Sequence, residues 1–288
     1  MGAALQMLPA SARLPANRYQ PDVGALPGVP FTVPLAGAVA RLRALPVPPL
    51  WLEGRIGLEA AMLARDPIWR GQGVADGNGR PVLLIPGFLA GDGSLRMLTA
   101  WLRRAGYRTR RAGVRANVGC SQAACEQLEA RLELMAERSG DRVVVVGQSR
   151  GGHFARALAV RRPDLVAGIV CLGSPMLNPF AVHPLVLLQV GVVGVLGSAS
   201  VPGLFSHRCW RGSCCERFRD ALVEPFPDEV GYVSMYSRSD GIVDWRSCLD
   251  PAADQVEVNA SHCGMSVNVE AYRATAHALA AFAERATA

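Results

Sequence analysis

The chain has 288 residues, of which 50% are hydrophobic and 19% charged, and its formal net charge is +6 at pH 7. This composition excludes global disorder, and the length is sufficient for a core that folds without a disulfide or a metal. No run of about 18 apolar residues occurs, so no membrane-spanning helix is expected. The basic residues are all arginine and are scattered, apart from Arg103-Arg104 and Arg108-Thr109-Arg110-Arg111. No nucleic-acid partner is therefore expected.

Proline and alanine dominate residues 1–50, which predicts an extended N-terminal arm before a main domain over residues 51–288. The first residues have neither a basic start nor a long apolar stretch, so a signal peptide is not expected. The expected location is the cytoplasm, with contact to a membrane surface as an alternative and secretion left open. A short helix is predicted over residues 56–65, because Pro67 stops it.

From Pro81 onward, apolar runs alternate with segments whose apolar residues recur at helical spacing. The runs predict strands at residues 82–85, 107–111, 143–146, 165–172, 230–236 and 255–259. Strands that are apolar on both faces are typical of a parallel sheet covered by helices on both sides. The sequence therefore predicts an α/β fold with a mostly parallel central sheet, closed by a helix over residues 269–282.

The sharpest motif is Gly147-Gln148-Ser149-Arg150-Gly151, which matches G-x-S-x-G. It follows four valines and opens a predicted helix, the strand–turn–helix setting that exposes a nucleophilic serine. Glycines two residues before and after the serine allow neighbouring elements to approach closely. The motif predicts Ser149 as a nucleophile.

A serine nucleophile needs a base and an acid that orients the base. His262 follows the last predicted strand and is the expected base, because the other four histidines lie in less suitable segments. Asp240 is the first carboxylate after the preceding strand and is the expected acid. Asp244 is the alternative, and the aspartate that is not used is expected to cap the next turn. The order Ser149, Asp240, His262 agrees with that of G-x-S-x-G hydrolases.

Two backbone amides are expected to form the oxyanion hole. One belongs to Arg150, the residue after the nucleophile, and the other to the loop after the first core strand, Ile85-Pro86-Gly87-Phe88-Leu89. Phe88 is the expected donor in this loop, with Leu89 as the alternative.

These motifs resemble those of the α/β-hydrolase superfamily, and in particular of small bacterial lipases and esterases and related actinobacterial hydrolases. The resemblance covers about Arg80 to Phe282. It implies an α/β-hydrolase fold, the triad Ser149, Asp240 and His262, and oxyanion amides of Phe88 and Arg150. Two positions depart from the family pattern, since Pro86 and Gln148 stand where many members have histidine. Neither is a triad position, so the departures bear on substrate preference.

Residues 175–228 interrupt the alternation and are predicted to form a cap or lid insertion. Their apolar stretch, residues 185–196, would span about 18 Å as a helix, too short for a bilayer of about 30 Å. It is interpreted as a wall of an acyl pocket or as a buried cap segment, and the two are compatible. The residues predicted to contact substrate are Leu89, Met176, Leu177 and Phe180, together with Phe88.

Eight cysteines occur, but Cys120-x4-Cys125 and Cys209-x4-Cys214-Cys215 do not have the usual spacing of zinc ligands, and no histidine pair completes them. Cys171 lies in an apolar run and is expected in the core. A local disulfide among Cys209, Cys214 and Cys215 is conceivable in an oxidising compartment. No metal or organic cofactor is expected.

Three functions are compatible with these residues. The first is a serine carboxylester hydrolase that cleaves a lipid-like or other apolar acyl ester through an acyl-enzyme. The second is a thioesterase or acyltransferase with the same triad, and the third is a non-catalytic binding module on the same fold. The sequence favours the first, with a small-molecule or lipid-like ester as partner and the oligomeric state left open.

Overall fold

The computed structural model describes residues 48–285. The chain divides into two units, Met1–Leu45 and Pro46–Ala288, and the description concerns the second. The arm predicted for residues 1–50 lies outside the described residues, apart from 48–50.

A six-stranded sheet with the order β2-β1-β3-β4-β5-β6 organises this unit. Every strand pair in it is parallel. The strands are β1 Pro81–Ile85, β2 Arg108–Arg111, β3 Val143–Gln148, β4 Val166–Leu172, β5 Gly231–Tyr236 and β6 Asp254–Glu257. The helices are α2 Ile56–Arg65, α3 Arg96–Arg104, α4 Ser121–Ser139, α5 Arg150–Arg161, α6 Pro184–Ser198, α7 Arg208–Arg211, α8 Glu216–Val223 and α9 Val269–Arg285.

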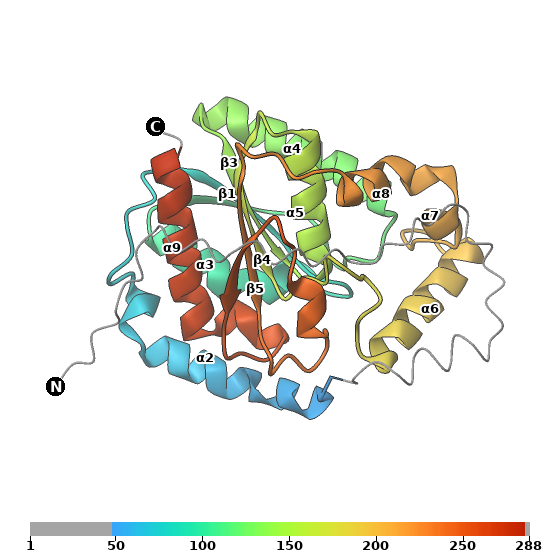
Figure 1. The fold of residues 1–288 in the computed structure, drawn as a ribbon, viewed down its shortest axis with the longest axis horizontal. Helices are drawn as coiled ribbons and strands as arrows, with labels where there is room; N and C mark the ends of the chain where they lie inside the picture. The colour runs from blue at the N-terminus through green and yellow to red at the C-terminus, as the bar shows by residue number, and fades with distance from the viewer. Residues whose placement is uncertain (1–47, 286–288) are drawn as a thin grey trace. The chain divides into compact units, whose positions relative to one another are not determined.

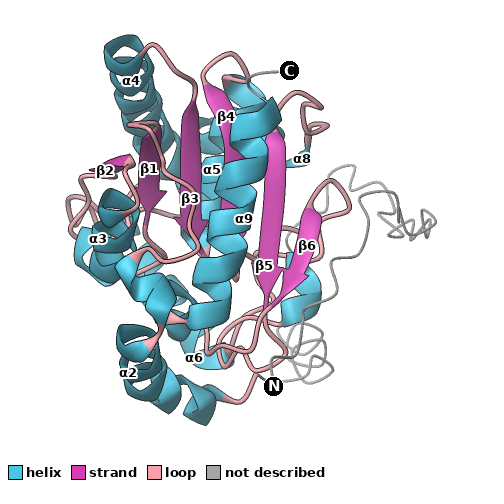
Figure 2. Cartoon of the chain, turned by 90° about the vertical axis from the view of Figure 1, so that its left-hand side faces the viewer, coloured by secondary structure: helices cyan, strands magenta, loops and turns pink. Residues whose placement is uncertain are grey.

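Successive side chains of a strand point to opposite sides of the sheet. The apolar strands therefore contribute side chains to a core on each face. In β3, Val144 and Val146 belong to one core cluster, whereas Val143 and Val145 belong to the other. The first cluster includes Trp101 of α3 and Tyr272 of α9, and the second includes Phe154 of α5. Figure 2 shows α9 in front of β4 and β5, with α5 behind the sheet. The prediction of a parallel sheet covered on both faces is confirmed.

The predicted elements agree closely with the observed ones. The helix expected at residues 56–65 is α2 with the same bounds, and the strands differ from prediction mainly by one to two residues at their ends. Helix α4 begins at Ser121, and Cys120 occupies the N-cap position without a side-chain cap.

The segment between β4 and β5 contains α6, α7, the short 3-10 helix η4 Ser213–Cys215 and α8, without a strand. Figure 1 shows α6, α7 and α8 together on the right, next to the sheet. Leu188 and Val195 of α6 are exposed, whereas Val193 is buried. Among residues 48–285, no helix combines the length and the apolar character needed to cross a membrane.

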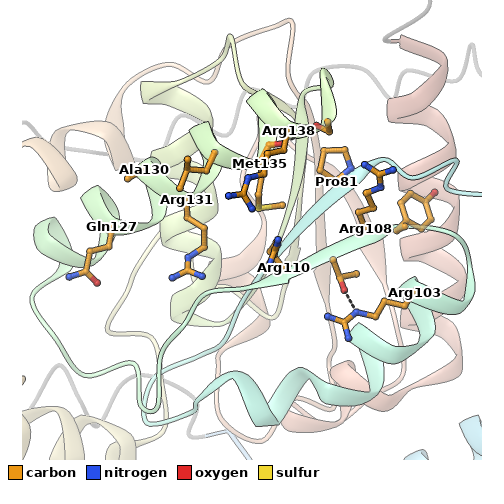
Figure 3. Close-up of a pocket in the computed structure, with 13 residues that line it drawn as sticks. Pro81, Arg103, Arg108, Arg110, Gln127, Ala130, Arg131, Met135 and Arg138 are labelled. Carbon is orange, nitrogen blue, oxygen red and sulfur yellow. Dashed lines mark hydrogen bonds between the residues drawn. The ribbon is translucent and has the colours of Figure 1, made fainter.

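Arginines from both basic clusters and from α4 line one groove. A groove of about 710 Å³ between α3, β2 and α4 is lined by five arginines, Arg103, Arg108, Arg110, Arg131 and Arg138 (Figure 3), and none of its lining residues is acidic. The fold therefore gathers basic residues on this face that are scattered in the sequence. The groove contains none of the predicted site residues, although it is larger than the cavity at Ser149.

Candidate active site

Ser149 occupies the turn that joins β3 to α5. Its φ of 52° and ψ of −120° are a strained conformation for a residue with a side chain. The turn needs the two glycines of the motif, because a Cβ atom at Gly147 would overlap the backbone of Gly151, and one at Gly151 would overlap the carbonyl of Ile85. The Ser149 amide donates to the Leu172 carbonyl at 2.8 Å. This hydrogen bond holds the strained backbone of Ser149 at the carboxyl ends of β3 and β4.

Asp240 and His262 form a buried pair. His262 Nδ1 lies 2.7 Å from Asp240 Oδ2, and the other oxygen, Oδ1, accepts the amides of Ile242 and Val243 at 2.8 and 2.7 Å. Burial lowers the pKa of His262, but the negative charge of Asp240 and its hydrogen bond outweigh burial and raise that pKa, with a further contribution from Glu53. The imidazole is therefore oriented and biased towards accepting a proton.

A side-chain hydrogen bond and a close approach of Gly173 connect this pair to the nucleophile turn. Gln148 Nε2 donates to the His262 carbonyl at 3.1 Å. A Cβ atom on Gly173, which follows β4, would lie 3.0 Å from His262 Nδ1 and 3.2 Å from Asp240 Oδ2. The segments that follow β3, β4, β5 and β6 therefore converge at one edge of the sheet, as ligand-binding segments of open parallel sheets do.

The alternatives for acid and base have other partners. Asp244 is the N-cap of the 3-10 helix η5 Trp245–Cys248 and accepts the Arg246 amide at 3.1 Å, as expected for the aspartate that does not pair with the histidine. His153 is buried, with Nε2 3.2 Å from the Pro175 carbonyl, and burial lowers its pKa to about 4. His153 is therefore expected to be neutral near pH 7, and its Nε2 atom contacts the Pro175 carbonyl.

The loop after β1 lies against the nucleophile. A Cβ atom on Gly87 would be 3.2 Å from Ser149 Cβ. Asn117, a buried residue, donates from Nδ2 to the Pro86 carbonyl at 2.8 Å, and its own carbonyl accepts Arg150 Nη1 at 2.6 Å. Asn117 thus ties the loop after β1 to the helix after Ser149. The sequence analysis missed Asn117, and the assignment of the Phe88 and Arg150 amides as oxyanion donors stays a prediction.

Two glutamates before the sheet also contact the loops that carry Asp240 and His262. Glu53, in the 3-10 helix η1 Leu50–Arg55, accepts the amides of Gly241, His262 and Cys263 at 2.9, 2.8 and 2.9 Å. Glu59 of α2 is buried and accepts Ser261 N and Oγ at 2.8 and 2.7 Å. These carboxylates hold the segments that carry Asp240 and His262, and the sequence analysis assigned neither a role.

We expect Glu53→Gln to lower the pKa of His262. The negative charge of Glu53 favours the imidazolium, so its removal disfavours protonation and moves the titration to lower pH. The imidazole titration followed by NMR measures this shift without any assumption about activity. Glu257→Gln is the matched control, because Glu257 contacts Arg238 and Tyr236 instead. If His262 titrates at the same pH in the wild type and in both variants, Glu53 does not raise the pKa of His262.

Ser149 opens into a cavity of about 300 Å³ with mainly apolar walls. Helix α6 contributes Val186, Leu187 and Val190, and the segment after it contributes Phe205 and Trp210. Of the five residues predicted to contact substrate, Phe88 and Phe180 line this cavity. Leu89, Met176 and Leu177 are not among its lining residues. Leu89 and Leu177 are exposed, and Met176 packs against the core. For these three the geometry gives no support.

The comparisons with known proteins agree on the fold. The family model described as "alpha/beta hydrolase fold" matches residues 80–191. No curated protein sequence matches the chain. Taken with the parallel sheet and the strand–turn–helix at Ser149, the family model identifies the architecture as the α/β-hydrolase fold. The resemblance expected from the motifs is thus confirmed at the level of the fold.

Solved structures of lipases and esterases have the same architecture. A metagenomic carboxyl esterase is 16% identical at a TM-score of 0.55, covering 86% of this chain and 99% of its own. The mature lipase BlEst2 of Bacillus licheniformis is 16% identical at 0.53, with coverages of 72% and 94%. A monoglyceride lipase of Saccharomyces cerevisiae is 15% identical at 0.51, with coverages of 76% and 90%. At these identities the likeness establishes the fold alone.

Proposed function

We propose that this protein is a serine carboxylester hydrolase that cleaves esters with apolar acyl groups. The observation that carries the proposal is the buried His262–Asp240 pair at the sheet edge where Ser149 sits on a strained turn. A serine on a strained turn and an oriented imidazole at the same sheet edge are the parts that nucleophilic acyl transfer requires. The names of the lipases and esterases with the same fold are consistent with it.

The proposed reaction has two halves. Ser149 Oγ attacks the ester carbonyl while His262 accepts its proton, and the resulting oxyanion receives hydrogen bonds from the amides of Phe88 and Arg150. The tetrahedral intermediate then expels the alcohol, which takes the proton from His262, and leaves an acyl group on Ser149. Water, deprotonated by His262, releases the acid and restores the serine. Asp240 keeps the imidazole in the tautomer that accepts at Nε2.

The apolar cavity supports an apolar acyl group as the substrate class. Its walls come mainly from side chains such as Val186, Leu187 and Phe180, which cannot satisfy a polar group removed from water. The residues predicted to form a lid thus supply the contact surface that would distinguish acyl chains.

We expect hydrolysis of p-nitrophenyl esters to be faster for medium acyl chains than for acetate, because each buried methylene contributes about 0.8 kcal/mol. Leu187→Trp, which fills the cavity, is expected to lower kcat/KM for the best long ester about 10-fold or more relative to acetate. Chain-length profiles of the wild type and the variant measure both effects.

Leu188→Trp is the matched control, since Leu188 is the next residue of α6 and is 63% exposed. Its chain-length profile is expected to equal that of the wild type. The same profile in all three proteins would mean that this cavity does not hold the acyl chain.

A further inference from the structure

Four cysteines that are distant in sequence meet beside the cavity. Cys120 precedes α4, whereas Cys209 lies in α7 and Cys214 and Cys215 in η4. The four sulfur atoms lie within 4.8 Å of one another. The Sγ atoms of Cys120 and Cys215 are 3.4 Å apart, and those of Cys214 and Cys215 are 3.8 Å apart. A disulfide joins its sulfurs at about 2.05 Å, so these are four separate thiols.

These separations agree with those of a tetrahedral metal–thiolate site. Four sulfurs at about 2.3 Å from a central Zn²⁺ are about 3.8 Å from one another. Four thiolate ligands in this arrangement are typical of structural zinc sites. Spacing between neighbouring cysteines does not indicate this cluster, because the fold brings in Cys120, 95 residues from Cys215.

Backbone amides at the start of one helix face two of the sulfurs. The Ala123 and Gln122 amides donate to the Cys120 sulfur. The Gln122 amide also donates to Cys215. These amides belong to the first turn of α4, whose dipole stabilises anions.

The guanidinium group of Arg150 lies next to the residues that flank Cys120. Arg150 donates from Nη2 to the Gly119 carbonyl and to Ser121 Oγ at 2.8 and 3.0 Å, on either side of Cys120. Burial lowers the pKa of Arg150 to about 10, and negative charge on Cys215, Cys209 or Cys120 opposes that shift. A tetrathiolate zinc centre carries a net charge of −2, which Arg150 and the start of α4 would partly balance.

We propose that Cys120, Cys209, Cys214 and Cys215 bind one Zn²⁺ as a tetrahedral tetrathiolate site. The four thiols release their protons when the metal binds. The site joins the segment before α4, which also carries Asn117, to the insertion between β4 and β5. Because α7 and η4 are only four and three residues long, they contribute little stability of their own. The metal therefore fixes Cys209 and Cys215, both of which line the cavity at Ser149.

Metal analysis of the purified protein tests this proposal independently of the proposed hydrolase activity. Protein produced with zinc and purified without chelator is expected to contain one zinc per chain. Cys120→Ser and Cys214→Ser are expected to bind zinc at least 10-fold more weakly. Cys263→Ser, an exposed thiol outside the cluster, is expected to retain one zinc per chain.

Two measurements on the wild type keep the test independent of whether the variants fold. Reduced apoprotein titrated with Co²⁺ is expected to develop the visible absorption of a tetrahedral tetrathiolate centre, saturating at one metal per chain. Denatured protein treated with chelator but no reductant is expected to react with a thiol reagent at all eight cysteines. Absence of both zinc and the Co²⁺ spectrum, or a count of four thiols from two disulfides, would overturn the proposal.

Discussion

Ser149→Ala is expected to reduce ester hydrolysis by roughly 10⁴- to 10⁶-fold, the range that loss of a triad nucleophile produces. Alanine keeps the Cβ atom, so the turn with φ of 52° carries the same strain and the free energy of unfolding should change by less than about 0.5 kcal/mol. Initial rates with a p-nitrophenyl ester and a thermal melt measure the two quantities on the same sample.

Ser174→Ala is the control for this loss. Ser174 is a buried serine that follows β4 and weakly contacts the Leu172 carbonyl at 3.5 Å, outside the proposed chemistry. Its activity is expected to stay within about 10-fold of the wild type. If Ser149→Ala retained wild-type rates while remaining folded, the nucleophile would have to be another group.

Asp240→Asn is expected to lower kcat by about 10⁴-fold, the effect known for a triad aspartate. The reason lies in the two oxygens of Asp240. Oδ1 accepts two backbone amides, so the asparagine oxygen would stay there and its NH₂ group would face His262 Nδ1. The imidazole would then carry its proton on Nε2 and could not accept one from Ser149. Single-turnover kinetics measure this loss in the acylation step.

Asp244→Asn separates the two candidate acids. Asp244 caps η5, and asparagine is an equally good N-cap, so this variant should keep nearly full activity. A large loss in Asp244→Asn together with a small loss in Asp240→Asn would reverse the assignment that the sequence order suggests.

Local patterns were sufficient to predict the sheet and to predict that Ser149, Asp240 and His262 follow strands that end at one edge of it. Four consecutive valines before Gly147 identify a buried strand, and the serine two residues later must lie at its carboxyl end. Likewise, the loops after β5 and β6 carry Asp240 and His262 because parallel strands end at the same edge. These inferences need only periodicity and topology, which neighbouring residues determine.

Contacts between distant segments were not predictable in this way. Glu53 is 209 residues from His262, and nothing in a single sequence links a glutamate in a short N-terminal helix to a histidine loop. The same holds for Cys120 and Cys215. The cavity walls were also only partly anticipated, because their residues depend on how α6 packs rather than on its apolar composition.

Labelling with a fluorophosphonate, followed by intact-mass analysis and peptide mapping, tests the central claim most directly. The reagent reacts with a serine only where a neighbouring base activates it. The proposed mechanism predicts one adduct per chain, on Ser149, with labelling lost in Ser149→Ala and strongly slowed in Asp240→Asn. An unlabelled wild-type protein, or an adduct on a different residue, would contradict the assignment of Ser149, Asp240 and His262 as a catalytic triad.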